Sequence, residues 1–193
     1  PSTLIQLPWR QEQGKVARMF CDVFYPDGRA FERDTRSILK TAVAQAAAKG
    51  YEFAFGAEME FYLFKIDELG QATTLPHDRA GYMDIVPDDK GEHIRREICL
   101  MLEQMGIQTE SSHHESGPGQ NEIDFRYSDP LTAADNAITF QAVVRMVAAQ
   151  NGLCASFMPK PLPDWDGSGM HINISAKGDG GRDLLPAVMA VIL

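Results

Sequence analysis

Cysteine is scarce in this chain of 193 residues, and its three copies lie far apart. Cys21, Cys99 and Cys154 each stand in an apolar run, which predicts three buried free thiols and a reducing compartment. Long apolar runs are also missing, since none approaches the roughly 18 residues that a membrane-spanning helix needs. No basic and then apolar leader opens the chain, so the expected location is the cytoplasm.

Positive charge is in short supply as well. Eighteen Lys and Arg stand against 27 Asp and Glu, which gives a net charge of −9. Such a surface repels nucleic acid and anionic membranes, so neither is expected as a partner, whereas divalent cations are attracted to it. The hydrophobic share of 44% is that of an ordinary globular protein and argues against disorder.

The two ends of the sequence resemble cut ends. Pro1 stands where an initiator Met would be. Asp183 opens a stretch that becomes wholly apolar and stops at Leu193 without a helix stop signal. We therefore expect the chain to be a fragment of a longer polypeptide.

The periodicity of apolar residues predicts an α+β fold. Strands are expected at residues 16–24, 51–64, 107–115, 120–127, 153–158 and 169–175, and helices at 34–50, 90–105 and 131–151. Residues 67–89 have no sustained period and are predicted to be a long loop. The order of elements, with a hairpin turn at residues 116–119, predicts a largely antiparallel sheet backed by helices.

Several predicted strands combine an apolar face with acidic or histidine side chains on the other. The residues concerned are Glu58, Glu60, Glu115, Glu122 and His171. Carboxylates that lie close together repel one another, so such a cluster requires cations. Oxygen ligands with one imidazole and no thiolate match Mg²⁺ or Mn²⁺ rather than structural zinc. A pair of such ions typically serves phosphate chemistry.

Each of these features also has a simpler interpretation. Glu58 and Glu60 alone would form a solvated strand face, and residues 113–115 would be the exposed end of a hairpin. His171 alone would be a core histidine, and the glycines of residues 167–169 are a weak signal for phosphate binding. The recurrence of ligand types on one side of several strands favours a metal site. Without any family, the residues support a divalent-cation-binding domain.

Four ordered segments carry a resemblance to a known family. They are GAEMEFYLF (56–64), HHESGPGQNEIDF (113–125), FMPKP (157–161) and GSGMHINIS (167–175). They resemble the successive catalytic blocks of the type I glutamine synthetase family. Residues 16–40 resemble the end of that family's β-grasp domain and the entry to its catalytic domain. The resemblance implies a β-grasp remnant at residues 1–33 and the N-terminal half of the catalytic domain at 34–193.

The resemblance implies two sites for Mg²⁺ or Mn²⁺. Glu60, Glu115 and Glu122 correspond to the ligands of the first metal, on the substrate side. Glu58 and His171 correspond to two ligands of the second metal, on the nucleotide phosphates.

The resemblance also implies substrate contacts. Glu110, Asn173 and Ser175 correspond to residues that contact or line the ATP pocket, and Asp166 and Gly167 to the loop that holds glutamate. The family's later catalytic residues are expected beyond Leu193, so the fragment itself should be inactive.

The implied activity is glutamine synthesis. ATP phosphorylates the γ-carboxylate of glutamate, and ammonia then attacks the acyl phosphate to give an amide. The family further implies a dodecameric homo-oligomer with its sites between subunits.

Two positions depart from the family pattern. Asp166 stands where Asn is usual, and Asn173 stands where His is frequent. An acid near the nucleophile would favour a cationic amine, so a γ-glutamyl-amine or polyamine ligase of the same family is an alternative. A non-catalytic metal-binding or structural relative is a third hypothesis, and the complete set of five metal ligands argues against it.

Overall fold

The computed structural model describes residues 2–10, 14–181 and 183–184, and the chain divides into two compact units. The first unit comprises Pro1–Gly56, Tyr127–Asp135 and Asn173–Leu193, and the second comprises Ala57–Arg126 and Asn136–Ile172. Strand β3 (Glu52–Ile66), helix α3 (Pro130–Gln150) and strand β8 (Met170–Lys177) each contribute to both units. The apolar stretch expected at the C-terminal end lies, from residue 185 onward, outside the described residues.

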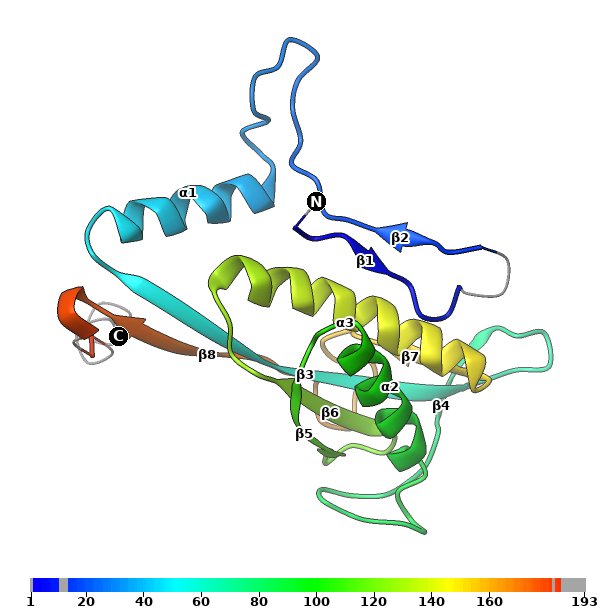
Figure 1. Ribbon diagram of the computed structural model, residues 1–193. Coiled ribbons are helices and arrows are strands. Elements are labelled where there is room, and N and C mark those ends of the chain that lie inside the picture. Colours follow the sequence, from blue (N-terminus) through cyan, green and yellow to red (C-terminus); the bar gives the residue numbers. More distant parts are fainter. Residues whose placement is uncertain (1, 11–13, 182, 185–193) are drawn as a thin grey trace. The chain divides into compact units, whose positions relative to one another are not determined.

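The first unit contains a short hairpin and helix α1 (Figure 1). Strand β1 (Ile5–Gln6) pairs with β2 (Ala17–Arg18), so the strand predicted for residues 16–24 is much shorter than expected. Helix α1 (Thr35–Ala47) begins where it was predicted to begin. The Asp34 side chain accepts hydrogen bonds from the backbone N–H groups of Arg36 and Ser37, which satisfies donors that the first helical turn leaves open.

The second unit is built on a six-stranded sheet. Its strands are β3, β4 (Ala72–Pro76), β5 (Thr109–His114), β6 (Gln120–Phe125), β7 (Leu153–Ser156) and β8. The order along the sheet is β4-β3-β6-β5, and β7 and β8 also pair with β3. The pairings of β3 with β4, β6 and β7, and of β5 with β6, are antiparallel. The predicted α+β fold with a largely antiparallel sheet is confirmed.

Two helices cover one face of this sheet, namely α2 (Glu92–Gln104) and the second unit's part of α3 (Figure 1). Phe140 of α3 packs on Phe61 of β3 and on Phe157, with ring centroids 5.9 and 6.0 Å apart. Ile94 and Ile98 of α2 are fully buried. Side chains alternate along a strand, so the neighbours of Phe61 on β3 point to the face away from these helices.

Two sequence-based expectations need correction. Residues 67–89 are not one loop, because β4 pairs with β3 after a turn in which the Asp67 side chain accepts from the N–H groups of Leu69 and Gln71. The prediction of three buried cysteines also needs correction. All three cysteines are free, but Cys21 is exposed and the other two are only partly buried.

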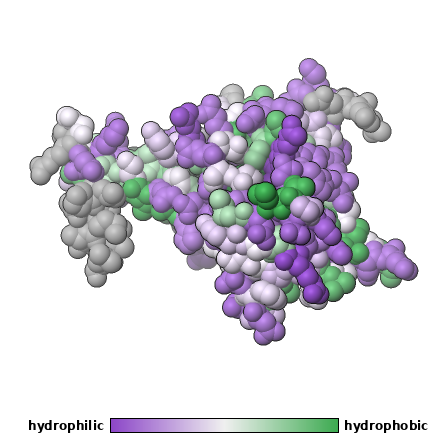
Figure 2. Space-filling view, turned by 90° about the horizontal axis from the view of Figure 1, so that it is seen from below, coloured by the Kyte–Doolittle hydropathy of each residue, from purple (hydrophilic) through white to green (hydrophobic). Residues whose placement is uncertain are grey.

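No helix in the described part of the chain is long and apolar enough to cross a bilayer. Seen from below, the molecule is mainly hydrophilic, with apolar side chains in separate areas (Figure 2). Among the exposed apolar residues of the second unit are Trp165, Met170 and Ile172.

Candidate metal centre

Neighbouring strands present acidic side chains on the sheet face away from α2 and α3. In the register of β3 with β6, Glu60 lies opposite Glu122 and Glu58 lies opposite Asp124. In the register of β5 with β6, His113 lies opposite Glu122. Opposed residues of antiparallel strands share a face and have Cβ atoms about 4.5–5.5 Å apart. The register therefore brings His113, Glu122 and Glu60 into one row across three strands.

The group of potential metal ligands on this face consists of His113, Glu115 and Glu122. One ligand atom from each residue lies within 4.8 Å of the other two. His113 Nδ1 is 3.4 Å from Glu115 Oε1, and His113 Nε2 is 3.6 Å from Glu122 Oε2. The three side chains are 18%, 14% and 10% exposed, so they are largely removed from water.

The structure thus brings together two of the predicted ligands, Glu115 and Glu122, and adds His113. Sequence reasoning missed His113 and treated it as part of a hairpin end. The signal that could have found it is its spacing, because residues two positions apart on a strand share a face. His113 stands two positions before Glu115.

Glu60 borders this group and is held by a neighbouring amide. Gln120 Nε2 donates a hydrogen bond to Glu60 Oε2 at 2.8 Å. Since Glu60 also lies opposite Glu122, the three predicted ligands of the first metal occupy one part of the sheet face.

Glu58 and His171 form a second, more exposed pair. His171 Nδ1 lies 3.2 Å from Glu58 Oε2, and the side chains are 67% and 33% exposed, respectively. The pairing of β8 with β3 brings the two residues together. They are the two residues that the resemblance implied for the second metal.

The electrostatics of the first group suit a bound cation. Burial, followed by the hydrogen bond to Glu115 and the charge of Asp124, raises the pKa of Glu122 to about 9. The Glu115–Glu122 pair therefore shares a proton at neutral pH when no cation is present. Carboxylate oxygens with imidazole nitrogens and no thiolate are a donor set for Mg²⁺ or Mn²⁺, and such an ion would replace this proton. The residues fit the metal that the resemblance implies.

The comparison with known sequences decides the family. Residues 32–187 match the glutamine synthetase catalytic domain. The chain belongs to the glutamine synthetase family. The glutamine synthetases of Clostridium saccharobutylicum and Methanosarcina mazei are 54% and 50% identical to it, over 92% and 93% of this chain. The chain spans 40% of the length of each of these two curated relatives.

Solved structures of the family share the fold. A structure described as a GmaS/ADP complex is 33% identical, with a TM-score of 0.82 over 95% of this chain and 42% of that chain. The glutamine synthetase of Plasmodium falciparum has a TM-score of 0.81 over 94% of this chain and 41% of that chain. At 24% identity the second likeness concerns the fold alone.

The predicted substrate loop of this chain lies beside Glu60. Tyr62 Oη donates to the backbone oxygen of Asp166 at 2.5 Å, and Gln120 Nε2 donates to that of Gly167 at 3.0 Å. These bonds attach the loop between β7 and β8 to the strands that carry the acids. A glutamate-binding role for Asp166 and Gly167 stays a prediction.

The predicted nucleotide residues fall in different units. Glu110 lines a cleft of about 640 Å³ in the second unit. Its Oε1 lies 3.7 Å from Nε of Arg126. Asn173 and Ser175 are exposed residues of β8 in the first unit. Their common role in binding ATP stays a prediction.

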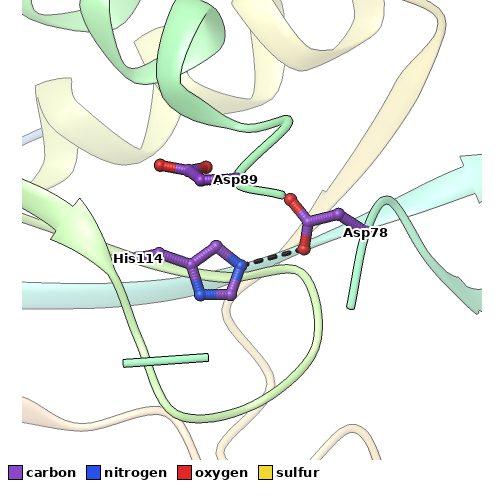
Figure 3. A group of neighbouring side chains, drawn as sticks. All are labelled: Asp78, Asp89 and His114. Atoms are coloured by element: carbon purple, nitrogen blue, oxygen red, sulfur yellow. Dashed lines mark hydrogen bonds and ion pairs between the residues drawn. The ribbon is translucent and has the colours of Figure 1, made fainter. Parts of the chain in front are cut away.

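A second group of potential ligands, Asp78, Asp89 and His114, is buried (Figure 3). The Asp78 carboxylate points at the His114 ring, with Oδ1 2.9 Å from Nε2. Asp78 also accepts from the backbone N–H groups of Gly119 and Lys90. Its oxygens are therefore already engaged.

Asp89 and His114 are also fully engaged. Arg95 binds both carboxylate oxygens of Asp89, at 3.1 and 2.5 Å. His114 Nδ1 lies 2.6 Å from the backbone oxygen of Glu115. Burial opposes a charge on His114, but the bonds to Asp78 and to this backbone oxygen outweigh it and raise the pKa. We interpret the group as a polar core that fixes the hairpin carrying Glu115, and not as a metal site.

Binding of Mg²⁺ to this chain should strengthen as the pH rises. With a pKa of about 9, Glu122 must release a proton before it can ligate a cation. Affinity should therefore rise by up to about tenfold per pH unit below pH 9. Calorimetry in buffers of different ionisation enthalpy measures the released proton. The Glu122→Gln variant lacks the titrating group, so the weak Mg²⁺ binding that remains should release no proton. Binding to the parent without proton release at neutral pH would contradict the expectation.

Gly169 keeps space free for the Glu60 carboxylate. A Cβ atom at residue 169 would lie 2.5 Å from Glu60 Oε1 and 3.0 Å from His171 Cε1. We expect Gly169→Ala to displace Glu60 and weaken Mg²⁺ binding by about 10- to 100-fold, the effect of losing a supporting contact. The control is Gly81→Ala, whose Cβ would meet Asp84 at an ordinary 3.5 Å. Equal Mg²⁺ affinity of both variants in calorimetry would show that the space at Gly169 is unimportant.

Proposed function

We propose that the whole protein is a glutamine synthetase, an ATP-dependent ligase that forms glutamine through a γ-glutamyl phosphate. The observation that carries the proposal is the approach of Glu115 and Glu122 in the buried group, with Glu60 on the opposing strand. Membership of the family supports the same reaction.

In this proposal the acids divide between two cations. Glu60, Glu115 and Glu122 hold the first Mg²⁺ or Mn²⁺, with His113 beside them. Glu58 and His171 hold the second. Bound there, the ions offset the charges of the glutamate carboxylate and the ATP phosphates, which otherwise repel one another.

The remaining predicted residues position the substrates. Asp166 and Gly167 orient glutamate from the loop attached to Tyr62 and Gln120. Glu110, Asn173 and Ser175 line the ATP pocket. A relative at 33% identity is described as an ADP complex, which supports nucleotide binding in this fold.

The organisation of the whole protein follows the family in this proposal. Residues 1–33 are the end of a β-grasp domain, and residues 34–193 are the first half of the catalytic domain. The protein is cytoplasmic and forms a dodecamer with sites between subunits, which light scattering on the whole protein tests. These 193 residues alone bind metal and do not turn over.

The test of the reaction is a substrate screen with the whole protein. With Mg²⁺, ATP, glutamate and ammonia we expect phosphate release and glutamine in equal amounts, and neither product when Mg²⁺ is withheld. Phosphate release that does not depend on a divalent ion would contradict the proposal.

A second candidate is a γ-glutamyl-amine ligase of the same family, favoured by Asp166. This acid lies in the exposed part of the loop whose backbone is bound by Tyr62, beside the strand of Glu60. A carboxylate there would attract a cationic amine better than an asparagine would. The same screen with a panel of mono- and polyamines distinguishes the candidates, since the amine ligase should prefer an amine over ammonia.

A further inference from the structure

Gln120 is a buried amide that contacts both a predicted metal ligand and the predicted substrate loop. Its side chain is on β6, and the residue is 1% exposed. One N–H of Nε2 donates to Glu60 Oε2 at 2.8 Å, and the other donates to the backbone oxygen of Gly167 at 3.0 Å. Both amide hydrogens are thus used, one on each partner.

The orientation of this amide is fixed from its other end. Gln120 Oε1 accepts from the backbone N–H of Gly117 at 2.9 Å, and Tyr62 Oη lies 3.3 Å away. A flipped amide would place Nε2 against the Gly117 N–H and an oxygen against the Glu60 carboxylate, so only one orientation satisfies all partners. A rotation of the amide that follows a movement of Glu60 therefore also moves the donor that holds Gly167.

We infer that Gln120 couples occupation of the first metal site to the order of the 166–168 loop. A cation on Glu60 fixes the carboxylate, the carboxylate fixes the Gln120 amide, and the amide holds the Gly167 carbonyl. Gln120 is a positioning residue and touches neither metal nor substrate. The inference rests on the proposed function, because it takes Glu60 as a metal ligand and the loop as the glutamate-binding segment. By reciprocity, an amino acid that orders the loop should tighten metal binding by the same factor.

Tyr62 offers a matched comparison. Its hydroxyl binds the same loop, at the Asp166 backbone oxygen, but makes no hydrogen bond to Glu60 in the described structure. The hydroxyl also lies 3.3 Å from Gln120 Oε1, and when it is lost the shorter bond from the Gly117 N–H still holds that oxygen. Loss of the Tyr62 hydroxyl should loosen the loop without breaking the connection to the metal site. Loss of the Gln120 amide should loosen the loop and also break its connection to the metal site.

The test is amide hydrogen exchange of Ser168, followed by NMR on this chain with and without Mg²⁺. The Ser168 N–H donates to the backbone oxygen of Pro159 at 2.8 Å and so reports the order of the loop. In the parent, saturating Mg²⁺ should slow this exchange by about 5-fold or more, the lower end of usual couplings between sites. Gln120→Met, which keeps the length of the side chain, should exchange faster than the parent and show no response to Mg²⁺. Tyr62→Phe should also exchange faster but keep the response.

Calorimetry with Mg²⁺ on the same samples separates the possible failures. If Mg²⁺ binds the parent and Ser168 exchange does not change, the coupling is wrong and the proposed metal site stands. If Gln120→Met binds Mg²⁺ and retains the full response, another contact transmits it and the inference is overturned. If the parent binds no Mg²⁺, the proposed metal site is itself wrong, and the coupling with it. If Gln120→Met does not fold, the parent still offers a decisive negative result, because Mg²⁺ binding without a change in Ser168 exchange overturns the inference.

Discussion

Glu122→Ala is expected to remove Mg²⁺ binding from this chain and, in the whole protein, ATP-dependent amide formation. Glu122 has contacts to both other members of the buried group and lies opposite Glu60, so no other residue of the cluster replaces it. Loss of a residue that only supports a metal ligand weakens metal affinity by about 10- to 100-fold. Loss of a ligand itself should therefore weaken Mg²⁺ affinity by more than roughly 100-fold. Glu60→Ala should have the same effect. Calorimetry and a phosphate-release assay are the measurements.

The control for these variants is Glu68→Ala. Glu68 is an exposed acid in the turn between β3 and β4, and its replacement by Ala removes one carboxyl group, as Glu122→Ala does, but at a site away from the cluster. Mg²⁺ affinity should stay within about twofold of the parent, since a single distant surface charge is screened by salt. If Glu122→Ala and Glu68→Ala bind Mg²⁺ equally well, general acidity and not this cluster attracts the cation.

Asp78→Ala is expected to lower the free energy of unfolding by about 3–5 kcal/mol, because it leaves the buried His114 without its counter-charge. The two side chains are 1% and 0% exposed and 2.9 Å apart. The variant also removes the acceptor for the N–H groups of Gly119 and Lys90. Urea unfolding measures the loss. Since this core fixes the hairpin of Glu115, Mg²⁺ binding should weaken as well.

An exposed ion pair supplies the comparison for this variant. Asp27 and Arg29 lie 2.8 Å apart with side chains 53% and 73% exposed, so breaking the pair should cost less than about 1 kcal/mol. A loss in Asp78→Ala no larger than that in Asp27→Ala would show that the buried pair is dispensable.

The stabilisation by the buried pair should also depend on pH. The pKa of His114 in the folded protein is raised above its ordinary 6.5. The stabilisation that charged His114 contributes is therefore complete below pH 6.5 and is lost as the pH rises through the pKa of the folded state. Burial raises the pKa of Asp78, but the hydrogen bond and charge of His114, together with the N–H groups of Gly119 and Lys90, outweigh it and lower the pKa below 3.8. The contribution of Asp78 is therefore lost only in stronger acid. The difference in unfolding free energy between parent and Asp78→Ala should therefore be largest at mildly acidic pH.

Local patterns were sufficient to predict most elements of the sheet and its helices. The alternation along β3 separated Glu58 and Glu60 from the core residues, because strand periodicity depends only on backbone geometry. The start of α1 was predicted at residue 34 for a similar reason, since the cap that Asp34 forms there involves neighbouring residues alone. Strand β4 was missed because it is held by pairing with β3 across a turn and has little apolar periodicity of its own.

The sequence predicted which residues belong to the candidate metal centre better than it predicted how they are arranged in space. Glu115 and Glu122 meet because of the hairpin register, and a shift by one residue would have turned one of them to the other face. The same register adds His113, which no local pattern distinguishes from its neighbour His114, fully buried beside Asp78. Contacts such as that of Gln120 with Gly167 join residues far apart in the chain, and periodicity carries no information about them.

The most direct test of the account is anomalous X-ray scattering from a crystal of this chain grown with Mn²⁺. The account predicts a peak within about 2.0–2.2 Å of carboxylate oxygens from Glu60, Glu115 and Glu122, the usual distance for a hard divalent cation. A peak among Asp78, Asp89 and His114, or ordered manganese only at scattered surface acids, would contradict it.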